Sequence, residues 1–121
     1  MAFRVNYASK AKNKFNAKST TYDGKWYGSK LEASQAEMLD WRLKAGEIIE
    51  WKKQVKIDLT VNGVHITNYY IDFVATRKDG IKEYIEVKGL EMPVWQMKWR
   101  LLQALKDELL EPGAELIVIK K

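Results

Sequence analysis

Residues 70–89 read YIDFVATRKDGIKEYIEVKG, and this stretch decides the fold. Its two apolar runs are separated by Asp-Gly at positions 79–80, a dipeptide typical of a tight hairpin turn. Because side chains alternate between the two faces of a strand, Glu86 and Lys88 point the same way at the end of the second run. The spacing therefore predicts an antiparallel hairpin that brings Asp72 close to both residues at one edge of a sheet.

The residues on either side of this hairpin predict further strands and two helices. Ser29 and Glu32 have the spacing of a capping box, followed by apolar residues at helical intervals, so we expect a helix over residues 30–45. Pro93 suits the first turn of a second helix, which we expect to end at Glu111-Pro112-Gly113. Strands are expected in a hairpin at residues 20–27, in a segment 48–59 interrupted at 51–53, and over 55–61, 64–76, 81–88 and 115–119.

This order of elements predicts an α/β fold with a central mixed β-sheet flanked by helices. At 121 residues the chain is long enough for one small domain with a single core. We expect that domain to cover residues 19–121, preceded by a flexible basic arm at residues 1–18.

Positive charge is concentrated at the start of the chain. Residues 1–31 contain seven lysines and arginines against a single aspartate, whereas the remainder contains 14 basic and 15 acidic residues. Lysines that reach phosphates release condensed counterions, so this distribution favours a nucleic-acid partner over a merely solubilising tail. The lysines that we expect to bind DNA are Lys10, Lys12, Lys14, Lys18, Lys25 and Lys30, with the neighbouring Trp26 as an aromatic contact.

Composition excludes several other classes of protein. The chain has no cysteine, which excludes a disulfide framework and a thiolate zinc site. It has no apolar run of the roughly 20 residues that a membrane-spanning helix requires, and its start does not look like a secretory signal. We therefore expect an intracellular protein without a membrane partner.

Several short motifs together resemble the PD-(D/E)XK nuclease superfamily. They are an acidic residue in the first helix, Tyr70-Ile71-Asp72, and Glu86-Val87-Lys88. A wider pattern over roughly residues 20–102 is similar to small phage endonucleases near the archaeal-type Holliday junction resolvases. That pattern consists of Tyr22-Asp23-Gly24, Ser29-Lys30-Leu31-Glu32, Gln54, Val87-Lys88-Gly89 and Lys98. The chain has Ile71 where the superfamily name places proline, a position that varies widely in such enzymes.

The resemblance implies a restriction-endonuclease-like core and a role for each matching residue. Asp72, Glu86 and the Val87 carbonyl would bind Mg²⁺, with Mn²⁺ able to substitute, and Glu32 would be a further metal or water ligand. Lys88 would orient or help to deprotonate the attacking water, or act only as an electrostatic clamp on the phosphate. Both carboxylates suit a cation that prefers oxygen ligands and can activate water. The resemblance also places Lys98 near the active-site phosphate and Gln54 among the DNA-binding residues.

Each of these residues also has a purely structural explanation. The carboxylates of Asp72 and Glu86 could be edge-strand charges that discourage aggregation, with Lys88 as their ion-pair partner. Glu32 could simply close the capping box with Ser29. Lys98 falls on an apolar arc of the second helix that contains Val94, Trp95, Leu101, Leu102, Leu105 and Leu109, and its long side chain could extend to water.

The expected function is that of a Mg²⁺-dependent DNA endonuclease without a nucleotide cofactor, most consistent with a phage Holliday junction resolvase. A four-way junction has near two-fold symmetry, which suits a homodimer acting in the cytoplasm of a bacterial host. The sequence does not decide between one and two metal ions per site. The alternatives are a nicking, restriction-like or transposase-type endonuclease, and a non-catalytic DNA-binding module of the same fold.

Overall fold

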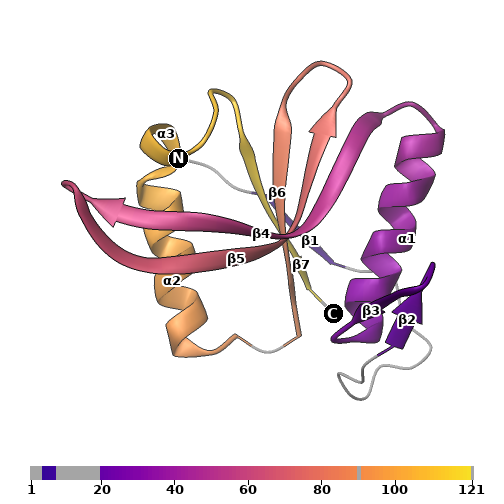
Figure 1. Cartoon of the computed structure of the whole chain (residues 1–121), viewed down its shortest axis with the longest axis horizontal. Helices are drawn as coiled ribbons and strands as arrows, with labels where there is room; N and C mark the ends of the chain where they lie inside the picture. Colours follow the sequence, from indigo (N-terminus) through magenta and orange to yellow (C-terminus); the bar gives the residue numbers. More distant parts are fainter. Residues whose placement is uncertain (1–3, 8–19, 90, 121) are drawn as a thin grey trace.

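The computed structural model describes residues 4–7, 20–89 and 91–120, and this part of the chain forms a five-stranded sheet between helices. The strands follow the order β1-β7-β6-β5-β4. Figure 1 shows helix α1 (Lys30–Lys44) on one side of the sheet and helix α2 (Pro93–Ala104) on the other. The prediction of an α/β fold with a central mixed sheet flanked by helices is confirmed.

The centre of the sheet is an antiparallel meander of three strands. Strands β4 (Ile48–Val61) and β5 (Val64–Arg77) are joined by Asn62-Gly63, whose φ angles of 50° and 80° place both residues in the left-handed region. Left-handed residues at both central positions give a turn whose twist matches that of the flanking strands. Strand β6 (Lys82–Lys88) then pairs antiparallel with β5, so the predicted hairpin around residues 79–80 is confirmed.

Strand β4 is longer than the sequence suggested. The predicted interruption at residues 51–53 is wrong, because Trp51 pairs with Ala75 and Lys53 pairs with Phe73 in a continuous antiparallel register. Trp51 packs against buried residues, whereas Lys52 is exposed, so this part of the strand alternates as a half-buried strand should.

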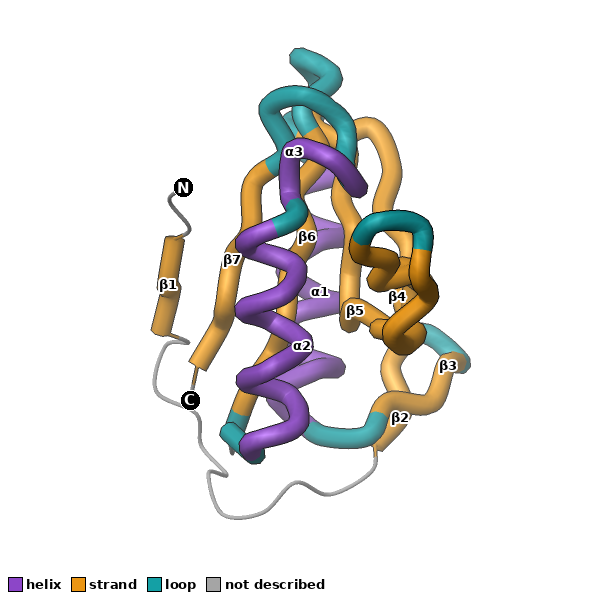
Figure 2. Tube along the Cα trace, turned by 90° about the vertical axis from the view of Figure 1, so that its left-hand side faces the viewer, coloured by secondary structure: helices purple, strands orange, loops and turns teal. Residues whose placement is uncertain are grey.

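Strand β7 (Glu115–Lys120) extends the sheet beside β6 in a parallel register, and the predicted strand at residues 115–119 is confirmed. Beyond it lies β1 (Arg4–Tyr7), which also runs parallel to β7 (Figure 2). Residues 4–7 therefore form a strand where the sequence predicted a flexible arm. Pairing with them provides hydrogen-bond partners for the backbone edge of β7. The other residues predicted to belong to the arm lie outside the described part of the chain, apart from these four.

The first helix begins and ends close to the predicted residues. A short hairpin formed by β2 (Thr20–Tyr22) and β3 (Lys25–Tyr27) precedes it, as expected. The Ser29 side chain caps helix α1 by accepting a hydrogen bond from the backbone N–H of Glu32 at 3.1 Å. This bond satisfies one of the amides that the first turn of a helix leaves without a partner.

The second predicted helix is divided in two. Helix α2 ends at Ala104, and a short helix α3 (Lys106–Leu109) follows it. The predicted apolar arc is also rotated, because Trp99 and Leu102 are buried while Val94 is 60 % exposed. The Trp99 ring stacks on the Trp95 ring with their centres 5.8 Å apart, and both rings pack among the buried side chains of the sheet. None of the helices in the described residues is long and apolar enough to cross a membrane.

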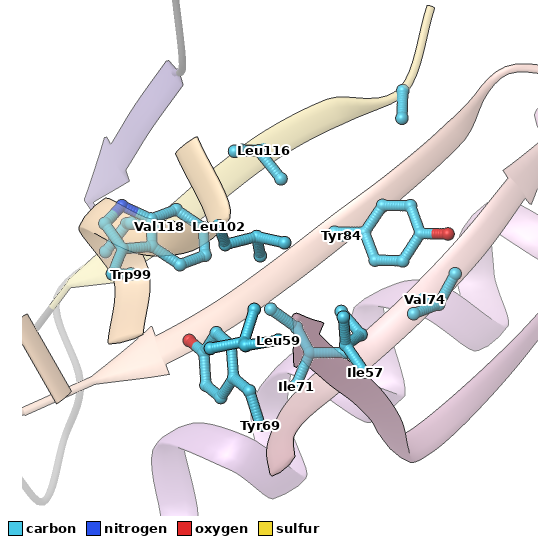
Figure 3. Close-up of a cluster of buried hydrophobic side chains, with 11 residues drawn as sticks. Ile57, Leu59, Tyr69, Ile71, Val74, Tyr84, Trp99, Leu102, Leu116 and Val118 are labelled. Atoms are coloured by element: carbon cyan, nitrogen blue, oxygen red, sulfur yellow. The ribbon is translucent and has the colours of Figure 1, made fainter. Parts of the chain in front are cut away.

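Two clusters of buried side chains lie on opposite faces of the sheet. The α2-side cluster, drawn in Figure 3, contains Ile57, Leu59, Tyr69, Ile71, Val74, Tyr84, Trp99, Leu102, Ala114, Leu116 and Val118. The α1-side cluster contains Tyr27, Ala36, Leu39, Ile48, Phe73, Ala75, Ile85, Val87, Ile117 and Ile119. Helices α1 and α2 thus cover opposite faces of the sheet, and the strands of the sheet contribute side chains to both clusters.

Candidate active site

Asp72 of β5 and Glu86 of β6 lie opposite each other on neighbouring strands. Phe73 pairs with Ile85 in the antiparallel register, so the next position along each strand places Asp72 across from Glu86. Asp72 Oδ2 accepts a hydrogen bond from the backbone N–H of Val87 at 2.8 Å, which fixes this carboxylate to the end of β6. The predicted meeting of the two acids therefore follows from the strand register.

Glu86 is almost completely removed from solvent, with 3 % of its surface exposed. Its Oε2 atom contacts Lys88 Nζ at 3.3 Å, whereas Oε1 is buried without a hydrogen-bond partner among the described residues. The pKa of Glu86 is raised to about 8, chiefly by burial and then by the negative charge of Asp72, against the lowering effects of Lys88 and the Tyr69 hydroxyl. A buried carboxylate oxygen without a partner is costly, so this atom marks a place where a ligand would be stabilising.

The pKa of Asp72 is also raised, to about 6, primarily because the carboxyl group is removed from water. The bond from the Val87 amide opposes this shift, while the charge of Glu32 adds to it. Two neighbouring carboxylates with raised pKa values form a site with an excess of negative potential. Such a pair can bind a divalent cation or hold protons in its absence.

Lys88 lies beside the acid pair, as the strand alternation predicted. Besides its contact with Glu86, its Nζ atom lies 4.9 Å from the centre of the Trp95 ring of helix α2. Its side chain is partly open to solvent. The ammonium group is thus held between a carboxylate and an aromatic face while remaining accessible to an anionic ligand.

Glu32 occupies the first turn of α1, and its contacts are with the start of the helix. Ser29 Oγ donates to Glu32 Oε1 at 3.3 Å, in addition to capping the Glu32 amide. Glu32 is nevertheless close enough to raise the pKa of Asp72 by its charge. The structure therefore places Glu32 at the helix cap, from which its charge acts on Asp72.

Lys98 and Gln54 have different positions relative to the acid pair. Lys98 Nζ donates to the backbone carbonyl of Asn68 in β5 at 3.3 Å, and among the described residues it forms no ion pair with either carboxylate. Gln54 Nε2 donates to Asp72 Oδ1 at 3.2 Å, so this predicted DNA-binding residue contacts one of the acids directly.

Sequence reasoning did not identify Tyr69, the aromatic residue beside Glu86. Tyr69 is buried next to it and accepts a hydrogen bond from Trp95 Nε1 at 2.9 Å. Simple alternation places residues 69 and 72 on opposite faces of β5, so no pattern could have assigned Tyr69 to the site. Among the described residues, no three histidine or acidic side chains gather into a ready metal-binding group, so the site is a pair of carboxylates.

Only part of the predicted DNA-binding set can be placed. Lys25 lies 5.5 Å from the centre of the Trp51 ring, and Lys30 is exposed at the start of α1. Lys53, which was not singled out, lies 3.9 Å from the centre of the Tyr27 ring. Lys10, Lys12, Lys14, Lys18 and the Trp26 side chain lie outside the described residues.

Comparison with protein families gives one match. The family model described as "Protein of unknown function (DUF1064)" matches residues 12–110, which include the acid pair, Lys88 and the first helix. No curated protein and no solved structure matches the chain.

Proposed function

Since the chain belongs to the DUF1064 family of proteins of unknown function, we propose from its site that it is a metal-dependent DNA endonuclease. The observation that carries this proposal is the buried pair Asp72 and Glu86, in which one Glu86 oxygen has no partner among the described residues. Lys88 beside the pair adds a positive charge at the same end of the strand. The resemblance of Glu86-Val87-Lys88 and Asp72 to the PD-(D/E)XK pattern, with its restriction-endonuclease-like core, supports the same function.

The side chains of the site fit a hard divalent cation. Mg²⁺ prefers oxygen ligands and is commonly bound by one or two carboxylates together with substrate phosphate and water. Asp72, Glu86 and the Val87 carbonyl would hold it, with Mn²⁺ as a substitute, and Glu32, whose charge acts on Asp72, would contribute through that charge or through a bound water. When bound, such an ion would activate water and neutralise charge on the phosphate that is being cleaved.

The remaining residues of the site would orient the phosphodiester and exclude bulk water. Lys88 is positioned to stabilise negative charge on the phosphate, because its ammonium is partly accessible and held in place by Glu86 and Trp95. Its ion pair favours the role of an electrostatic clamp over that of a base. Tyr69 lies beside the buried Glu86 carboxylate and is itself held by the hydrogen bond from Trp95, so it would help to keep water from that carboxylate.

Branched DNA is the substrate class that we propose, with a Holliday junction in phage recombination as the model. The basic residues near the start of the chain and Lys25 and Lys30 would contact phosphates without reading bases. A homodimer would supply two sites for paired cuts across a junction. A bacterial host cell infected by a phage is the corresponding setting.

Cleavage of defined DNA substrates tests this function. Labelled four-way junction, linear duplex and single strand are incubated with the protein in Mg²⁺ or in EDTA. We expect metal-dependent cutting with preference for the junction, and loss of cutting in Lys88→Ala with salt-sensitive DNA binding retained. Equal cutting of all three substrates would favour a less selective endonuclease. Binding without cutting in Mg²⁺ or Mn²⁺ would show a non-catalytic DNA-binding module.

A further inference from the structure

Gln54 has an unusual backbone conformation for a residue inside a strand. Its φ angle is 53°, in the left-handed region that side chains other than glycine rarely adopt. Two other described non-glycine residues, Asp23 and Asn62, have positive φ angles, but both precede a glycine in a hairpin turn. Gln54 instead lies in the middle of β4, opposite Asp72 of β5. A conformation of this kind persists only where the surrounding structure requires it, and it is frequent at functional sites.

The hairpin of β4 and β5 changes its buried face at this position. In β5, Phe73 belongs to the α1-side cluster and Ile71 to the α2-side cluster, although residues two apart normally share a face. In β4, Trp51 packs against the α1-side cluster and Val55 against the α2-side cluster. The switch thus falls at Gln54 in one strand and at Asp72 in the other. Figure 1 shows the two strands bending together along their length, with their outer halves directed toward the side of α2.

The side chain of Gln54 also holds Asp72 directly. Gln54 Nε2 donates to Asp72 Oδ1 at 3.2 Å, while the Val87 amide donates to Oδ2 at 2.8 Å. One donor comes from each neighbouring strand, so the carboxylate of Asp72 is fixed between β4 and β6. Hydrogen bonds of this type, which are made to a metal ligand and not to the metal itself, orient that ligand and are costly to remove.

We propose that Gln54 is a positioning residue for Asp72, acting through its left-handed backbone and through its amide. The backbone produces the change of face that brings Tyr69 to the side of Asp72 and Glu86, and the amide fixes the rotation of the Asp72 carboxylate, which the strand register places across from Glu86. The consequence for metal affinity rests on the proposed function, whereas the consequence for the order of Asp72 does not. Gln54 therefore acts through Asp72, in contrast to a residue that only contacts DNA.

Two variants separate the backbone effect from the amide effect. Gln54→Gly permits the left-handed conformation but removes the amide, whereas Gln54→Asn keeps an amide on a residue that tolerates this conformation. We expect Gln54→Gly to fold with a midpoint of urea unfolding at or above that of the wild type. Titration calorimetry should nevertheless show Mn²⁺ binding about 10 to 100 times weaker, with partial recovery in Gln54→Asn. Lys52→Ala, an exposed neighbour in β4, serves as the matched control and should bind Mn²⁺ as the wild type does.

A second readout in EDTA does not depend on metal. Hydrogen exchange of the Val87 amide, which donates to Asp72, should become about tenfold faster in Gln54→Gly, while exchange of the Ile85 amide stays unchanged. Faster exchange in a protein that binds no Mn²⁺ would support positioning and reject the metal proposal. Unchanged Val87 exchange would overturn the positioning role. Wild-type Mn²⁺ affinity in Gln54→Gly together with weaker DNA binding in EDTA would also overturn it, in favour of a direct DNA contact.

Discussion

Strand β6 carries two buried glutamates, Glu83 and Glu86, whose carboxylates differ in their partners. Glu83 is 1 % exposed and Glu86 is 3 % exposed, so both have lost almost all contact with water. Arg42 of helix α1 binds Glu83 with two hydrogen bonds of 2.8 and 3.0 Å, and Arg77 lies 3.7 Å from the same carboxylate. The ion pair that Glu86 forms is the 3.3 Å contact with Lys88, and its Oε1 atom is buried without a hydrogen-bond partner among the described residues.

This difference separates a carboxylate whose partners stabilise the fold from one that we propose to be functional. A bidentate guanidinium contact compensates for desolvation of Glu83 and joins α1 to the sheet. The incomplete set of partners around Glu86 leaves a negative site that can accept a cation. Burial by itself does not distinguish the two glutamates, whereas the satisfaction of their oxygens does.

The largest expected difference is in stability. Glu83→Gln should lower the free energy of unfolding by about 3 to 5 kcal/mol, because it removes the charge of a buried carboxylate that Arg42 and Arg77 stabilise. Glu86→Gln should cost far less in EDTA, since it removes a charge that the fold does not satisfy. Urea denaturation of both variants at pH 8 measures the two effects. Equal losses would remove the distinction between these residues.

The pH dependence of stability should differ in the same way. The pKa of Glu86 is about 8 in the folded protein, above its ordinary value of 4.5, so the folded state keeps a proton that the unfolded state releases. The contribution of Glu86 to stability is therefore present below about pH 4.5 and is lost as the pH rises toward 8. In metal-free protein we expect this loss to be about 1 to 3 kcal/mol, with Asp72 acting in the same direction.

Comparison of wild type with Glu86→Gln from pH 5 to pH 8 isolates this contribution. The variant should lose less stability over the interval, and Mg²⁺ should stabilise the wild type more at pH 8 than at pH 5, because the cation competes with protons. Parallel curves for the two proteins would show that Glu86 does not titrate in this range.

Substitution of the two basic residues that contact these glutamates, Arg42 and Lys88, should give the smallest effects on stability and on Mg²⁺ binding. Arg42→Lys replaces a bidentate contact with a single point charge and should cost about 1 to 2 kcal/mol of stability. Lys88→Arg should leave stability nearly unchanged but weaken Mg²⁺ binding, because a guanidinium can cover the free oxygen of Glu86. Thermal unfolding with and without Mg²⁺ measures both changes. Tighter Mg²⁺ binding in Lys88→Arg would contradict the role assigned to that oxygen.

Much of the site could be predicted because its signals are local. Glu86 and Lys88 are two positions apart and the turn at residues 79–80 is a dipeptide, so both signals lie within a few neighbouring residues. The register of the hairpin then places Asp72 across from Glu86. The capping contact of Ser29 with Glu32 is likewise local. Each of these features depends on a few neighbouring residues and is found in the structure as predicted.

The partners that distinguish the glutamates could not be predicted in this way. Arg42 and Glu83 are 41 positions apart, and only the packing of α1 on the sheet brings them together. Tyr69 reaches Glu86 because the hairpin changes face at Gln54, and glutamine has no propensity that announces a left-handed conformation. The buried face of α2 is rotated from the predicted arc and includes the stacked pair Trp95 and Trp99. A helical wheel places residues by angle alone and does not describe contacts between particular side chains.

Calorimetric titration with Mn²⁺ at pH 8 tests the metal site most directly. Glu50→Gln, at an exposed position of β4, is the matched control for Glu86→Gln. We expect the same Mn²⁺ affinity in the wild type and in Glu50→Gln, and an affinity at least about tenfold lower in folded Glu86→Gln. Unchanged affinity in Glu86→Gln would contradict the assignment of this carboxylate as a metal ligand.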